Sequence, residues 1–160
     1  MSDHVITGTW IYRSYLGSTK LLNRFAFNLP DLSSAHRKKM FQEFGEKAVK
    51  LMWAEGTVIL GEVSGGQAEG SLVFAKDVEL ALTATIESDS DGAPRTIRLE
   101  ATGQGLLTRG LKYSLLGWFV APWPESSDQK PTVVGSVINR GREDPEPVGT
   151  VGSFILVKAE

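Results

Sequence analysis

The most constraining feature of this chain is a series of short segments, running from residue 57 almost to the C-terminus, that have the length and spacing of β-strands. Short turn-forming links such as Ser64-Gly65-Gly66 and Gly103-Gln104-Gly105 separate most of them, and links of this kind join antiparallel neighbours. We therefore predict an antiparallel meander. Its expected strands cover residues 57–63, 67–75, 78–87, 95–103, 111–121, 132–139 and 149–158.

A further strand precedes these seven. Residues 5–16 alternate with a period of two, which places Gly8, Trp10, Tyr12 and Ser14 on one face. A short returning strand over residues 20–29 is plausible. The first strand and the seven later ones make eight, enough to close a sheet and leave no edge. The predicted fold class is all-β, an eight-stranded antiparallel up-and-down β-barrel.

Residues 33–53 have a different period. Apolar side chains recur there at three and four, with charged residues between them and Ser33 or Ser34 as a cap, and this pattern predicts an amphipathic helix. We interpret it as a helical insertion in a single domain that spans residues 1–160, because 160 residues suffice for one complete core.

Two expected strands carry apolar side chains on both faces. Residues 78–87 have one apolar and one polar face, whereas residues 111–121 and 151–157 are apolar on each. The outer wall there needs a cover, either from the predicted helix or from a second copy of the chain in a homodimer or higher homo-oligomer.

The composition excludes several classes of function. Lys and Arg total 17 against 19 Asp and Glu, which gives no basic field for nucleic acid. The chain has no cysteine, and His4 and His36 fit no metal-ligand spacing, so no metal or cofactor is expected. No segment approaches the ~18 apolar residues of a membrane helix, so we expect a soluble, cytoplasmic protein without a membrane partner.

Aromatic side chains next to glycine indicate a ligand pocket. Rings have apolar bodies, and those of Tyr and Trp also carry a hydrogen-bonding atom. Inside a small barrel they could enclose a small hydrophobic or aromatic molecule that polar side chains orient. The alternative is that the rings only fill the core. The candidate ligand-binding residues are Trp10, Tyr12, Ser14, Tyr113, Trp118, Trp123, Ser136 and Asn139.

An enzyme is the alternative to a binding protein. A cofactor-independent cyclase or isomerase can act by holding a flexible substrate in its reactive conformation, as in natural-product chemistry. The candidate catalytic residues are Glu62, which shares a strand face with Val58 and Leu60, and Tyr12. A buried carboxyl could act as a general acid or base, but Glu62 also lies beside a turn, which favours an exposed strand end.

Two motifs resemble the avidin and streptavidin family. They are Ile6-Thr7-Gly8-Thr9-Trp10 with Leu16-Gly17-Ser18-Thr19, and Leu116-Gly117-Trp118-Phe119-Val120-Ala121-Pro122-Trp123. The resemblance implies a calycin-type barrel, a ligand contact at Ser18, a polar binding position at Tyr12, and pocket rings at Trp118 and Trp123. Gly152 aligns with a ligand-binding aspartate of that family, so biotin is not expected as the ligand.

The C-terminal third resembles a group of uncharacterised bacterial proteins. The shared pattern is Trp123-Pro124, then Gln129-Lys130-Pro131, then Gly135-Ser136-Val137-Ile138. This resemblance implies a bacterial source.

Overall fold

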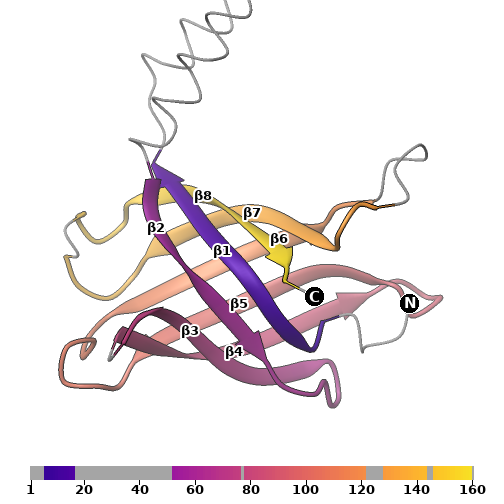
Figure 1. The fold of residues 1–160 in the computed structure, drawn as a ribbon, viewed down its shortest axis with the longest axis horizontal. Coiled ribbons are helices and arrows are strands. Elements are labelled where there is room, and N and C mark those ends of the chain that lie inside the picture. The colour runs from indigo at the N-terminus through magenta and orange to yellow at the C-terminus, as the bar shows by residue number, and fades with distance from the viewer. Residues whose placement is uncertain (1–5, 17–51, 77, 122–127, 144–145, 160) are drawn as a thin grey trace, which may run out of the picture.

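The computed structural model describes residues 6–16, 52–76, 78–121, 128–143 and 146–159, and these form a closed β-barrel (Figure 1). Each strand pairs antiparallel with the next, and the last pairs back with the first. The predicted fold class is confirmed. The strands are β1 (Gly8–Leu16), β2 (Met52–Leu60), β3 (Gln67–Ala75), β4 (Val78–Ser88), β5 (Pro94–Gly103), β6 (Lys112–Phe119), β7 (Thr132–Asn139) and β8 (Val151–Lys158).

The largest difference from the predicted strands concerns β2. It starts at Met52, so Met52 and Trp53, which the helical period assigned to the end of a helix, are strand residues. The period was misleading there because both residues also fit a strand that pairs with the end of β1. The rest of the predicted helix, residues 33–51, and the short strand over 20–29 lie outside the described residues.

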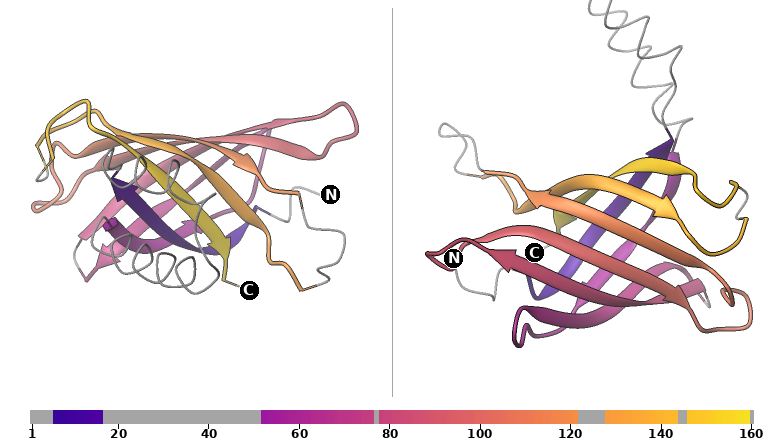
Figure 2. Two further views of the ribbon diagram at one scale, coloured as in Figure 1. Left: turned by 90° about the horizontal axis from the view of Figure 1, so that it is seen from above. Right: turned by 180° about the vertical axis from the view of Figure 1, so that it is seen from behind.

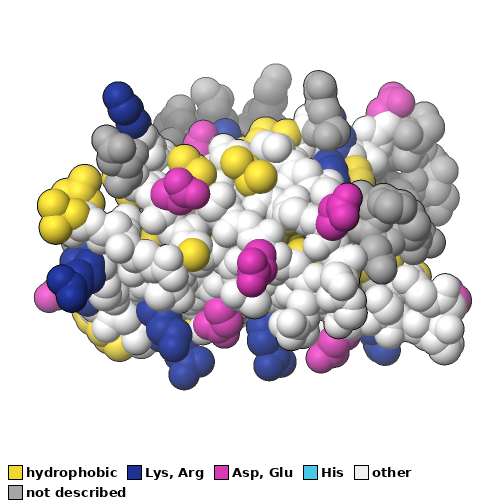
Figure 3. Space-filling model, turned by 90° about the horizontal axis from the view of Figure 1, so that it is seen from below, with side chains coloured by type: hydrophobic (Ala, Val, Ile, Leu, Met, Phe, Trp, Pro, Cys, Tyr) yellow, Lys and Arg dark blue, Asp and Glu magenta, His cyan; other side chains and the backbone are white. Residues whose placement is uncertain are grey.

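Side chains alternate between the barrel interior and its outer wall. Leu80, Leu82, Ala84 and Ile86 of β4 are buried as predicted, and their neighbours along the strand are exposed. On the face seen in Figure 3, acidic and basic side chains are interspersed, and apolar ones form small groups. The inward side chains form one hydrophobic core inside the sheet.

The outer wall over β6 and β8 is partly apolar, as predicted. Leu116, Trp118 and Val151 are exposed there, next to Val134 of β7. The helix that we expected to cover this wall lies outside the described residues. Association with a second copy of the chain stays a prediction.

One end of the barrel is closed by the chain's own residues, and we call it the sealed end. Ile6 and Trp10 are buried, and the Trp10 indole Nε1 donates a hydrogen bond to the Ile6 carbonyl (2.9 Å). The start of β1 lies beside the end of β8 (Figure 2), so the Lys158 ammonium sits 5.1 Å from the Trp10 ring centroid and donates to the Thr7 carbonyl. The buried Trp10 ring, with the Lys158 ammonium over its face, therefore closes this end.

Candidate functional site

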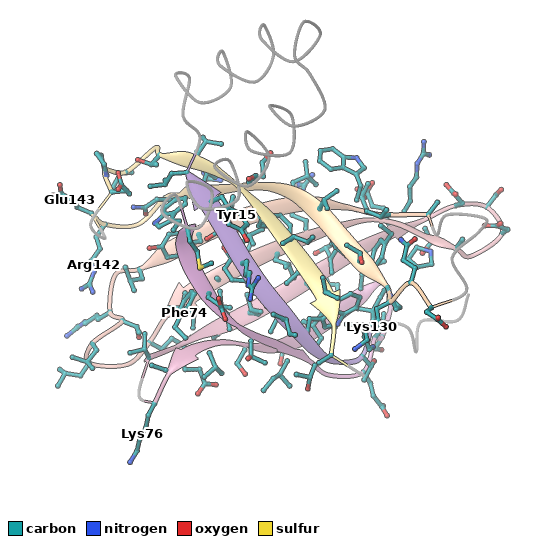
Figure 4. All side chains as sticks on the ribbon, turned by 45° about the horizontal axis from the view of Figure 1, so that its top comes forward. Tyr15, Phe74, Lys76, Lys130, Arg142 and Glu143 are labelled. Carbon is teal, nitrogen blue, oxygen red and sulfur yellow. The ribbon has the colours of Figure 1, made fainter. Side chains whose placement is uncertain are left out.

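A cavity of about 230 Å³ occupies the opposite end of the barrel. Lys76 and Arg142 lie toward this end in Figure 4, and Lys130 lies toward the sealed end. The ends of β1, β3 and β7 and the starts of β2, β4 and β6 surround the space, which we call the barrel cavity. The lining residues are Tyr12, Ser14, Trp53, Ala54, Leu72, Phe74, Val78, Leu111, Tyr113, Leu115 and Val137.

Aromatic rings form much of the wall and pack against one another. The Tyr12 ring is edge-on to Phe74, with centroids 6.2 Å apart, and stacks at the same separation on Phe154 of β8. Trp53 packs edge-on against Tyr113 at 5.9 Å. Rings in edge and stacked contacts hold one another in place, so the wall has a defined shape.

Irregular strand pairing positions two of these rings. The pairing of β1 with β2 shifts after Ser14, which leaves Trp53 without a direct partner on β1. The pairing of β3 with β4 shifts in the same way at Phe74. Such bulges change the direction in which a side chain points, and here both rings line the barrel cavity.

Two glycines make room for the same two rings. A Cβ at Gly152 would lie 3.0 Å from Trp53 Cε3, and one at Gly56 would lie 3.0 Å from Phe74 Cδ1. Both distances are shorter than an ordinary carbon–carbon contact. Backbone oxygens are closer still, because these Cβ atoms would lie 2.5 Å from the Tyr15 carbonyl oxygen and 2.7 Å from that of Val73. Any larger residue at either position would have to displace both the neighbouring strand and an aromatic wall of the barrel cavity.

The side chains of the lining carry four polar groups among the described residues, namely the hydroxyls of Tyr12, Ser14 and Tyr113 and the indole N–H of Trp53. Ser14 is completely buried, and its Oγ is the buried side-chain polar atom that has no hydrogen-bond partner among the described residues. Burial raises the pKa of Tyr12 to about 12, and the neighbouring Ser14 hydroxyl acts in the opposite direction. The Tyr12 phenol therefore stays protonated and uncharged at neutral pH.

Three of the residues proposed from the sequence come together in this lining, namely Tyr12, Ser14 and Tyr113. Their role in ligand binding remains a prediction. Trp123 and Ser18 lie outside the described residues.

Trp10, Trp118 and Ser136 do not line the barrel cavity, and a role for them in ligand binding stays a prediction. Trp10 belongs to the sealed end, where its indole is already bonded. Trp118 is 49% exposed, and Ser136 is also exposed. Both point outward because the buried side chains of their strands, such as Leu115 and Val137, occupy alternate positions.

Asn139 and Glu62 also lack the predicted surroundings. Asn139 is buried, but its amide donates to the carbonyls of Arg142 (2.8 Å) and Glu146 (3.1 Å) and accepts from the Gly141 N–H (3.2 Å). It holds its own loop, and both hydrogens of its amide are already used. Glu62 follows the end of β2 and is exposed, as the alternative interpretation of its position predicted.

Sequence reasoning missed Trp53 and Phe74. The alternation of β3 contained a signal for Phe74, because it lies two residues after the buried Leu72. Trp53 gave no such signal, since its inward position depends on the shift in pairing with β1.

Comparisons with known proteins leave the family open. No protein-family model, no curated protein and no solved structure matches the chain. Within the described ranges, no three His, Cys, Asp or Glu side chains gather to hold a metal ion. The described part also contains no helix long and apolar enough to cross a membrane.

Proposed function

We propose that this protein binds a small, largely apolar molecule in the barrel cavity. The observation that carries the proposal is an aromatic-walled space of about 230 Å³ next to a buried hydroxyl, Ser14 Oγ, that lacks a partner among the described residues. A buried hydroxyl without a hydrogen bond costs free energy, and a ligand with a suitable polar group would supply that bond.

The alternative to a ligand site is a packing defect, which the size of the space argues against. Protein interiors are close-packed and contain few voids larger than a water molecule. An apolar cavity of about 150 Å³ is enough to bind benzene, and the barrel cavity is larger than that. Closed eight-stranded barrels of this topology are also known to hold one small ligand, as in lipocalins and streptavidin.

The test is a screen of small aromatic and aliphatic compounds by thermal shift, followed by titration of the hits. Filling the space with Ala54→Phe should abolish binding, because Ala54 lines the barrel cavity. Ala81→Phe is the matched control, since Ala81 is exposed on the outer face of β4. Equal binding by both variants would show that the ligand sits elsewhere and would refute the proposal.

The same experiment addresses the enzymatic alternative. Each bound compound is incubated with the protein and recovered for mass spectrometry and chromatography. Recovery of the unchanged compound supports a binding protein. An isomerised or cyclised product would support the cyclase or isomerase instead, with Tyr12 rather than the exposed Glu62 next to the substrate.

A further inference from the structure

The charge of the lining constrains the ligand. Among the described residues that surround the barrel cavity, none is ionisable except the two tyrosines. Burial favours the neutral form of Tyr12. A carboxylate or an ammonium group drawn into this space would lose its hydration without meeting an opposite charge, which is costly. The lining therefore selects against charged ligands.

The shape of the walls favours a flat ligand. Trp53 and Tyr113 meet edge-on at one part of the wall, and Tyr12 and Phe74 meet edge-on at another. A planar ring system can lie against such faces and edges in the offset or T-shaped contacts that aromatic groups prefer. The volume exceeds the roughly 150 Å³ that suffices for benzene, which leaves room for a second fused ring.

The position of Ser14 adds a polar requirement. Its Oγ can donate one hydrogen bond and accept others. No described residue bonds to it with ordinary hydrogen-bond geometry, although the Tyr12 phenol is near enough for the Ser14 hydroxyl to lower its pKa. Tyr12 is two residues away on the same inward face of β1, so two hydroxyls lie along one side of the barrel cavity. A ligand that buries its ring against the aromatic wall can present one polar group to this side.

We infer that the ligand is an uncharged, fused bicyclic aromatic molecule with one hydrogen-bonding group, such as a hydroxyl, that bonds to Ser14. The inference rests on the proposed function, because it specifies the chemistry of the molecule that occupies the same cavity.

The test compares three probes of one ring system by isothermal titration calorimetry, namely 2-naphthol, naphthalene and 2-naphthoate. We expect 2-naphthol to bind about three- to tenfold more tightly than naphthalene, the gain of one hydrogen bond. We expect 2-naphthoate to bind at least about a hundredfold more weakly than 2-naphthol, because its charge would be buried without a partner.

Ser14→Ala tests the proposed hydrogen bond to Ser14 directly, since it removes one oxygen and preserves the aromatic walls. The affinity for 2-naphthol should fall to that for naphthalene, and the affinity for naphthalene should stay within about twofold of the unsubstituted protein. Ser136→Ala is the matched control, because that serine is exposed on the outer face, and it should change neither affinity.

The outcomes separate the inference from the function on which it rests. If naphthalene or 2-naphthoate binds as tightly as 2-naphthol, the ligand class is wrong and the barrel cavity remains a binding site. If 2-naphthol still binds more tightly than naphthalene to Ser14→Ala, the hydrogen bond to Ser14 is wrong. If none of the three probes binds, the inference fails, and the proposed function fails with it only if the screen of aromatic and aliphatic compounds also finds no ligand.

Discussion

Replacing Ser14 by alanine should stabilise the ligand-free protein, although it removes a completely buried side-chain atom from the core. A buried hydroxyl without a hydrogen bond costs about 1–3 kcal/mol. The void left by one oxygen costs only about 0.5 kcal/mol. The net expectation is a gain of about 1 kcal/mol, or roughly 2–4 °C in Tm for a chain of this size.

The assay is equilibrium unfolding in urea, with protein that has been unfolded and refolded to remove any bound small molecule. Asn139→Ala is a matched comparison, because Asn139 is equally buried at the same end of the barrel but its side chain makes three hydrogen bonds. Its loss should cost about 2–4 kcal/mol. A Ser14→Ala protein that is less stable by about 1 kcal/mol or more would refute the reasoning, since it would mean that the hydroxyl is satisfied in solution.

Three further predictions concern the walls and the sealed end. Gly152→Ala should destabilise the protein by about 1–3 kcal/mol in urea unfolding and weaken 2-naphthol binding, because the new methyl group would lie 2.5 Å from the Tyr15 carbonyl oxygen and 3.0 Å from the Trp53 ring; an unchanged protein would contradict the steric argument. Because burial raises the Tyr12 pKa from its ordinary value of 10 to about 12, the contribution of Tyr12 to stability should be intact below pH 10 and fall between pH 10 and 12. Tyr12→Phe should reduce that fall by about 1 kcal/mol per pH unit, and equal slopes in the two proteins would count against it. Lys158→Met should cost about 1–2 kcal/mol in the same assay, through the lost contact with Trp10, and leave 2-naphthol affinity unchanged.

The topology could be predicted because it depends on local signals. Period-two alternation fixed which residues of β1 and β4 point inward, and short turns fixed which strands are neighbours. Once each strand pairs with the next, eight of them close the sheet.

The candidate site was predicted less well, partly because the same alternation was not applied to every residue. Tyr113 and Trp118 are five positions apart on one strand, and residues separated by an odd number point to opposite faces. Ser136 and Asn139, three positions apart, fail in the same way. A strict count would have kept Tyr113 inside and moved Trp118 outside.

Other parts of the site depend on contacts between strands that are distant in the sequence. Trp53 reaches the barrel cavity because β2 shifts its pairing with β1, and this shift follows from how the two strands fit together. The hydrogen bonds that occupy Asn139 come from the carbonyls of a loop that returns to it. Neither contact can be recognised from a periodic pattern in the sequence.

The size of the side chains at the inward positions explains why the barrel is filled at one end and hollow at the other. Toward the sealed end, inward positions carry large side chains such as Trp10, Val58 and Leu156. Further along the same strands β2 and β8, the inward positions fall on Gly56 and Gly152, and rings from neighbouring positions lean over them. These rings are fixed by close contact with the glycine backbone and with one another, so the barrel cavity has its shape before a ligand arrives. The binding that we propose would therefore require little rearrangement, and its selectivity would be set by the shape and the polar groups already present.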